Sequence, residues 1–107
     1  KAFASGVIRL FMKLPRQREE VRVVGKQLLR SATSVAAHIR EASRARSDDE
    51  FVSKLGGAAQ EADESQLWLE LLHEECKIDR ESLDALHTEA GELIAILTTI
   101  MRRTRSK

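Results

Sequence analysis

Two carboxylate–histidine pairs are the first residues in this sequence whose types and spacing could do chemistry. Glu70 precedes His73 by three residues, and Asp84 precedes His87 by the same spacing. On a helix this spacing puts both side chains on one face, as in the di-iron sites of four-helix bundles. Such a site also needs one glutamate from each of two further helices, and the segment 1–14 contains no carboxylate. We therefore expect no di-metal site.

Cys76 is the only cysteine, and it follows His73 at a spacing that could place both on one metal ion. A structural zinc ion requires four ligands, and this pair supplies two. We therefore predict no metal and no cofactor, and we interpret Cys76 as a small core residue. A lone cysteine forms no internal disulfide, which is typical of a reducing cytoplasm. No nucleophile–base motif, phosphate-binding glycine loop or dinucleotide fingerprint occurs, so we expect no enzymatic activity.

The elements that must position these residues are helices, because apolar residues recur with helical spacing and no strand-like alternation is sustained. Pro15 ends the first segment, since the residue before a proline is pushed out of the α region. The stretch "SDDE" at 47–50 is a capping box, and Asp79 is the expected N-cap of the last segment. The predicted helices span about residues 2–14, 19–45, 48–76 and 80–103.

The residues that should face the core form one stripe on each predicted helix. Four helices with short connections predict an all-α, antiparallel up-down-up-down four-helix bundle, with residues 1–107 in one domain. No apolar run reaches the length of a membrane span, so we expect no membrane contact. The predicted core residues are Phe3, Val7, Leu10, Phe11, Leu14, Val21, Val24, Leu28, Ala32, Val35, Ile39, Phe51, Leu55, Ala58, Ala62, Leu69, Leu72, Cys76, Leu83, Leu86, Ala90, Leu93, Ile94, Leu97 and Met101.

The predicted helix 19–45 carries two polar stripes beside its apolar one. Small residues on a helix allow a neighbouring helix to approach closely, which is our interpretation of Ser31 and Ser34. Gln27, His38 and Glu41 are predicted either to join a hydrogen-bonded network or to contact a partner. The polar stripe consists of Gln27, Ser31, Ser34, His38 and Glu41, and the basic stripe of Arg22, Lys26, Arg30, Arg40 and Arg44.

Charge is distributed unevenly along a chain whose net charge is only +1. Residues 1–47 contain 11 Lys/Arg and 3 Asp/Glu, residues 48–101 contain 3 and 14, and residues 102–107 contain 4 and none. Either the two halves pair within one protomer, or the basic half faces a partner. Contacts with phosphate would be salt-sensitive and independent of sequence. The candidate phosphate contacts are Arg22, Lys26, Arg30, Arg40, Arg44, Arg102 and Arg103.

The stretch "SQLWLELLHEEC" at 65–76 places large apolar residues on two sides of one helix. At about 100° per residue, Leu67 and Leu71 fall almost opposite the core residue Leu69, and Trp68 lies on the flank. A large apolar patch on the surface of a protein usually marks an interface. We therefore predict that Leu67, Trp68 and Leu71 pack against another protomer.

The segments "QLLRSATSVAAHIREASRARSDDEF" and "EADESQLWLELL" resemble the four-helix-bundle proteins related to the 23S rRNA intervening-sequence protein. Most members of that family have Asn where this chain has His38, and Gly is common where it has Ala42, so the role of His38 does not transfer. The matching positions are Gln27, Arg30, Ser34, Ile39, Glu41, Arg46, Ser47, Glu50 and Phe51.

The resemblance implies a homopentameric ring or barrel. It also implies kinship with the accessory protein of diversity-generating retroelements, which binds a reverse transcriptase and nucleic acid. Our first hypothesis is a non-enzymatic, homo-oligomeric scaffold or adaptor in the bacterial cytoplasm. The alternative is a nucleic-acid-binding accessory factor that docks a reverse transcriptase in such a retroelement. A metal-dependent oxidoreductase is the third hypothesis, and it is the weakest because its ligand set is incomplete.

Overall fold

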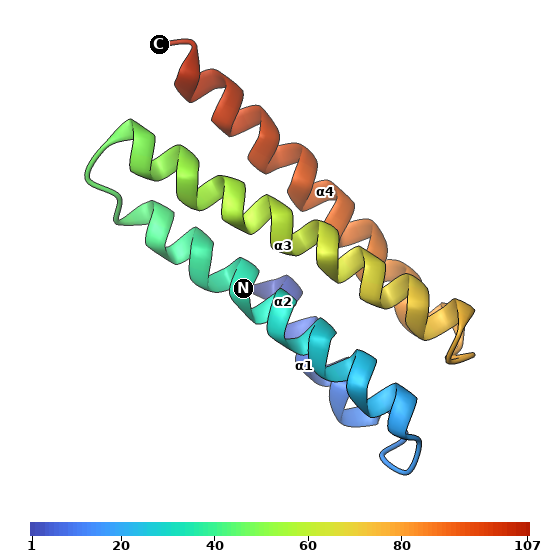
Figure 1. Ribbon diagram of the computed structural model, residues 1–107. Helices are drawn as coiled ribbons and strands as arrows, with labels where there is room; N and C mark the ends of the chain where they lie inside the picture. The colour runs from blue at the N-terminus through green and yellow to red at the C-terminus, as the bar shows by residue number, and fades with distance from the viewer.

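The computed structural model describes all 107 residues and contains four helices and no strand. They are α1 (Ala2–Lys13), α2 (Glu19–Ser43), α3 (Asp48–Glu74) and α4 (Arg80–Arg105). Consecutive helices run in opposite directions and are joined by short connections (Figure 1). The predicted all-α four-helix fold is confirmed.

Local signals in the sequence explain where the helices begin and end. Leu14 is extended, with a ψ of 146°, because Pro15 follows it, and α1 ends there. The Ser47 hydroxyl accepts a hydrogen bond from the Glu50 backbone N–H at 3.1 Å and starts α3. The Asp79 carboxylate accepts in the same way from the Glu81 N–H at the start of α4. Each cap satisfies an amide that the helix itself leaves unpaired.

The helix ends differ slightly from the predicted ones. α1 ends at Lys13 instead of Leu14, and α2 ends at Ser43 instead of Ala45. α2 ends early because its last turn tightens, with the Ala45 N–H bonded to the Ala42 carbonyl at 3.1 Å.

α3 and α4 also end at other residues than expected. α3 ends at Glu74 instead of Cys76, because Lys77 adopts a left-handed φ of 61° that turns the chain towards α4. α4 continues to Arg105, past the predicted Arg103, and the positive charge of its last turn suits a helix C-terminus.

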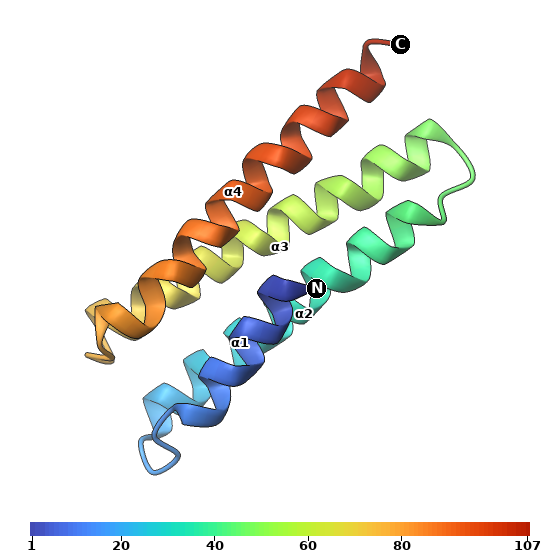
Figure 2. The ribbon, with the colours of Figure 1, turned by 180° about the vertical axis from the view of Figure 1, so that it is seen from behind.

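The four helices are arranged so that each contacts two others. α2 packs between α1 and α3, and α4 packs against α3 and α1, whereas the backbones of the pairs α1–α3 and α2–α4 do not approach each other closely. These two pairs therefore lie diagonally across a bundle that measures 50 × 19 × 18 Å. α1 is short and runs beside only part of α2, which leaves one end of the bundle with three helices (Figure 2).

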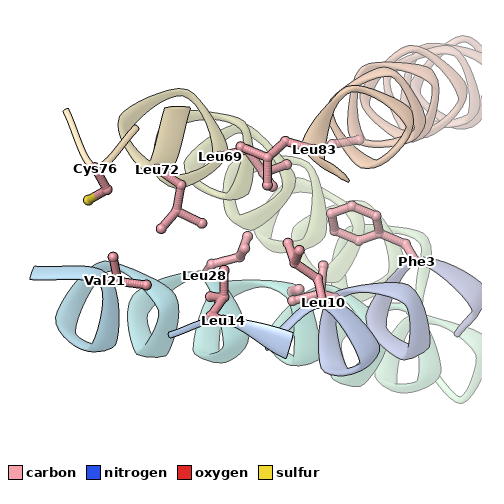
Figure 3. Close-up of a cluster of buried hydrophobic side chains, with 12 residues drawn as sticks. Phe3, Leu10, Leu14, Val21, Leu28, Leu69, Leu72, Cys76 and Leu83 are labelled. Carbon is pink, nitrogen blue, oxygen red and sulfur yellow. The ribbon is translucent and has the colours of Figure 1, made fainter. Parts of the chain in front are cut away.

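The core is divided along the bundle into two clusters. In the larger cluster, side chains from all four helices point into one interior, as Figure 3 shows for Leu10, Leu28, Leu69 and Leu83. The smaller cluster lies where α1 is absent and comes from three helices. It consists of Val35, Ala42, Leu55, Ala58, Ala62 and Leu97.

Most of the predicted core residues are buried, and the others are buried less than predicted. Several predicted residues are only half-buried, and five of them adjoin the smaller cluster, where a fourth helix is missing. Ser31, Ser65 and Thr104 are buried although no apolar stripe includes them. None of the four helices combines the length and the apolar character needed to cross a bilayer. The half-buried positions are Phe11, Val24, Ile39, Phe51, Leu86, Leu93, Ile94 and Met101.

Candidate functional site

The outer side of α3 carries exposed leucine among carboxylates. Leu67 keeps 46% of its surface exposed, although the neighbouring core residue Leu69 keeps only 1%. Leu71, one turn after Leu67, is half-buried. Covering exposed apolar surface with a partner lowers the free energy of the system by about 25 cal/mol per Å². The outer side of α3 is therefore suited to bind another protein surface.

Trp68 does not lie on this outer side. It is half-buried and packs against the larger core cluster of its own protomer. Its indole N–H is buried and has no hydrogen-bond partner within the protein. The three residues predicted as an interface thus divide into Leu67 and Leu71, which face outwards, and Trp68, which mainly fills the space beside the core.

The polar stripe of α2 meets a matching stripe of α3. Ser31 and Ser65 are both fully buried, and their hydroxyl oxygens lie 2.8 Å apart. Each hydroxyl has one proton, so one serine donates to the other, and the second serine donates to a backbone carbonyl of its own helix. For Ser31 that acceptor is the Leu28 carbonyl at 3.1 Å, and for Ser65 it is the Glu61 carbonyl at 2.9 Å. Two small polar side chains can be buried here because both are satisfied.

His38 and Glu61 continue this contact along the two helices. The Ser34 hydroxyl donates to Glu61 Oε2 at 3.1 Å, and His38 Nδ1 lies 2.8 Å from the Ser34 carbonyl. A proton on Nδ1 satisfies that carbonyl and leaves Nε2 free to accept. The imidazole packs on Gly57, where an added Cβ would lie 2.5 Å from the His38 ring. Glu61 Oε1 is buried without a partner.

The structure thus places only part of the predicted polar stripe in a network. Ser31, Ser34 and His38 belong to it. Gln27 is exposed and its side chain makes no hydrogen bond within the protein, and the exposed Glu41 forms an ion pair with Lys54 at 3.4 Å.

Gly57 is a residue whose type predicts a close approach of two helices, but sequence reasoning missed its α3 neighbours Glu61 and Ser65. These three residues are spaced by four, so they form one helix stripe that reads antiparallel to Ser31, Ser34 and His38. That spacing was the available signal. We call this contact the α2–α3 seam.

The predicted phosphate-contact residues are all exposed but do not form one surface. Arg102 and Arg103 are on α4, which lies diagonally from α2. Arg22 and Arg30 have weak ion pairs, with Glu19 at 3.7 Å and Glu64 at 3.9 Å. Lys26, Arg40 and Arg44 have none within the protein.

Two hollows border the basic stripe of α2. One, of about 440 Å³, is lined by Phe11, Arg16, Arg22 and Lys26 among others. The second, of about 640 Å³, lies at the other end of α2 and is lined by Lys1, Arg40, Ser43 and Arg44 with three apolar residues. Both hollows have apolar walls and positive rims, which suits an anionic partner with an apolar part.

The two carboxylate–histidine pairs do come together, in a hollow of about 400 Å³ between α3 and α4. His87 Nε2 lies 2.8 Å from Glu70 Oε2, while His73 Nδ1 lies 3.0 Å from the Ile78 carbonyl. No three His, Cys, Asp or Glu side chains are close enough to hold one metal ion. The hydrogen bond between Glu70 and His87 joins α3 to α4.

Cys76 is almost fully buried just beyond the end of α3, as predicted for a small core residue. Burial raises the pKa of its thiol, and the nearby Glu20 carboxylate raises it further. A thiol kept protonated and covered is a poor nucleophile. Its carbonyl accepts a hydrogen bond from Arg18 Nη2 at 2.7 Å, which ties the start of α2 to the end of α3.

Comparison with known proteins gives this fold a family. The sequence matches the model of the 23S rRNA-intervening sequence protein over residues 1–99. The chain belongs to the 23S rRNA-intervening sequence protein family. The predicted resemblance is therefore confirmed.

A crystal structure from Bacteroides thetaiotaomicron VPI-5482 has the same fold. It shows a protein with unknown function from the S23 ribosomal protein family, with 37% sequence identity and a TM-score of 0.85. The match covers 94% of this chain and 92% of that one. No curated protein matches the sequence. Membership of the 23S rRNA-intervening sequence protein family thus establishes the fold, and the function has to be argued from the surface.

Proposed function

We propose that this protein is a non-enzymatic, homo-oligomeric scaffold or adaptor whose copies associate through the outer side of α3. The observation that carries the proposal is the exposure of Leu67 on the side of α3 opposite its core face. An isolated exposed leucine is common, but here the half-buried Leu71 follows one turn later on the same side. The free, buried thiol of Cys76 is consistent with a cytoplasmic setting.

The size of the assembly in this proposal rests on the family resemblance, which implies a pentamer. A ring of identical copies would present five equivalent surfaces to a partner and would need no catalytic residue. Such multivalent binding raises the overall affinity for a repeated or symmetric partner without any new contact.

Disruption of the outer side of α3 tests the proposal. Leu67→Glu with Leu71→Glu should give folded monomers of 12.0 kDa by light scattering, whereas the wild type should have a multiple of that mass. Leu67→Glu alone serves as a milder variant because Leu71 is partly buried. Circular dichroism checks that both variants keep their helices. Ile96→Glu on α4 is the matched control, since Ile96 is 55% exposed, and it should keep the wild-type mass. An unchanged mass for the double variant would contradict the proposal.

A second candidate function is favoured by the cations of α2 that have no ion pair. Lys26, Arg40 and Arg44 could contact phosphates, as a retroelement accessory factor that docks a reverse transcriptase would require. Titration with RNA and duplex DNA at low and moderate salt tests this function. Arg40→Glu with Arg44→Glu should abolish binding, while Arg9→Glu on α1 should weaken it much less. Absence of binding by the wild type at low salt would exclude the candidate. A neighbouring reverse transcriptase gene with a variable repeat would favour it.

A further inference from the structure

The opposite charges of the two helical hairpins remain largely unpaired within the protomer. Only one ion pair, Arg30–Glu64 at 3.9 Å, joins a cation of residues 1–47 to an anion of residues 48–101. The other ion pair between α2 and α3, Lys54–Glu41, has its signs the other way round. The remaining pairs join neighbours within one hairpin. The charge imbalance of the sequence therefore appears on the surface as two separate faces.

The first face is basic and lies over α1 and α2. Lys1, Ile8 and Met12 follow one another by seven and four residues, so they share one stripe of α1, and Lys1 lines the hollow that contains Arg40 and Arg44. Ile8 and Met12 are 40% and 59% exposed. We define the basic face as Ile8, Met12, Arg22, Lys26, Arg40 and Arg44.

The second face is acidic and lies on the outer side of α3. It places Leu67 and Leu71 among the exposed carboxylates of Asp63, Glu70 and Glu74. These five residues define the acidic face. Each face therefore has apolar residues surrounded by charges that are mainly of one sign; the exceptions are Glu19 beside Arg22 and His87 beside Glu70. An apolar centre within a polar rim is the usual anatomy of a specific protein–protein interface. Both faces combine exposed apolar residues with charged ones, and their charges are opposite in sign.

The two faces cannot belong to one two-fold contact. The backbones of α1 and α3 lie diagonally across the bundle, and Ile8 and Met12 on α1 and Leu67 on α3 are all exposed, so the two groups lie on different sides of the bundle. Like charges would also meet if two acidic faces or two basic faces came together. A contact between different faces repeats from copy to copy, and it forms a closed ring when the rotation between copies allows it.

We propose that the acidic face of one copy docks onto the basic face of a second copy, head to tail. The leucines of α3 then cover Ile8 and Met12, and carboxylates meet the cations of α2 that have no partner within their own protomer. This inference rests on the proposed homo-oligomer, whose five-membered ring already requires a head-to-tail contact, and it goes beyond that proposal by naming the second surface of the contact. Its failure can be told apart from failure of the oligomer itself.

Complementation between two variants tests the polarity. In the first variant, Leu67→Glu with Leu71→Glu disrupts the acidic face and leaves the basic face intact. In the second, Ile8→Glu with Met12→Glu disrupts the basic face and leaves the acidic face intact. Both disrupted faces then carry carboxylates, so they cannot restore each other. The control variant, Ala85→Glu with Thr88→Glu, changes two exposed positions on α4 by the same charge.

The expected masses differ for each arrangement. Each variant alone should be a folded monomer, the control should assemble like the wild type, and a mixture of the two variants should give a 1:1 heterodimer of twice 12.0 kDa. A second variant that still assembles alone would overturn head-to-tail docking and leave an α3–α3 contact. A mixture that stays monomeric would overturn the docking as well. A monomeric wild type would overturn the proposed oligomer itself.

Salt and nucleic acid complete the test. The contact joins opposite charges at exposed positions, so salt should weaken it. Charges are screened beyond about 10 Å in 0.1 M NaCl and beyond about 3 Å in 1 M NaCl. On dilution, the wild-type assembly should therefore dissociate at a higher protein concentration in 1 M than in 0.1 M NaCl. If Arg40→Glu with Arg44→Glu abolishes RNA binding and leaves the assembly unchanged in both salt conditions, the basic face is a nucleic-acid surface and the proposal is wrong.

Discussion

The side of α3 that faces α2 and the outer side of the same helix break the usual pattern of a bundle in opposite directions. Facing α2, α3 buries polar and small residues, with Ser65 fully covered and Gly57 under an imidazole ring. On the outer side it exposes Leu67 in the middle of carboxylates. A helix of a simple four-helix bundle would have the reverse arrangement, with leucines inside and serines outside.

The difference teaches what each side contributes. On the seam, two small hydroxyls and a glycine let α2 and α3 approach closely, and their hydrogen bonds are satisfied only when the helices are in one register. On the outer side, no other part of the protomer covers the exposed side chain of Leu67. Changes to inner-side residues should therefore lower the stability of the protomer, and changes to the outer side should alter its assembly.

Truncation of a core residue beside the seam should have the largest effect on stability. Leu72 is fully buried, so Leu72→Ala should lower the free energy of unfolding by about 2–5 kcal/mol through lost burial and a new cavity. Urea unfolding at a protein concentration where the wild type is monomeric measures this loss. The matched control is Leu67→Ala, which should change stability by less than about 0.5 kcal/mol under these conditions. Equal losses for the two variants would refute the distinction between the sides.

The glycine of the seam should give the next effect. Gly57→Ala puts a Cβ 2.5 Å from the His38 ring, so one of the two must move. We expect Gly57→Ala to be less stable than Gly56→Ala by about 1–3 kcal/mol, because alanine favours the helix at both positions and only position 57 is overpacked. Gly56→Ala is a suitable control because its Cβ would meet only the Met101 sulfur at 3.8 Å.

A double-mutant cycle shows whether the loss comes from this contact. In the His38→Ala background, Gly57→Ala should destabilise much less, since the ring that it would meet is gone. The same loss in both backgrounds would show that helix–helix distance, and not the imidazole, restricts position 57.

Leu67→Cys should have the smallest effect on stability, and its thiol should differ most clearly in exposure from that of Cys76. Cys76 is 2% exposed and its pKa is raised by burial, so it should react slowly with maleimide until the protein unfolds. Leu67→Cys should change stability by about 0.5 kcal/mol or less and add one rapidly reacting thiol in dilute solution. Labelling of this thiol should slow as the protein concentration rises and the α3 face is covered. Rapid labelling at every concentration would place position 67 outside any contact.

Much of the fold was predictable because its signals are local. Pro15, the Ser47 N-cap and Asp79 each act on neighbouring backbone groups, so the helix ends could be predicted to within two residues. The ends that differ depend on the left-handed conformation of Lys77 and on a tightened turn after Ser43. Neither position has a glycine, which is the residue that would have predicted such a turn.

The candidate site was predictable only in part because its partners are far apart in sequence. Ser31 and Ser34 could be recognised as small polar residues, but pairing them with Ser65 and Glu61 requires the register between two helices. Trp68 lies on the flank of its helix, and periodicity alone does not decide whether a flanking ring turns inwards. Exposure of Leu67 follows from its helical position and did not need the register.

The mass of the wild-type protein in solution tests the central claim most directly. Light scattering over a range of concentrations should give a discrete multiple of 12.0 kDa, five times that mass for the pentamer that the resemblance implies. The mass should fall towards one copy on dilution. A mass of 12.0 kDa at every concentration would show that Leu67 is an ordinary exposed side chain and would contradict the account.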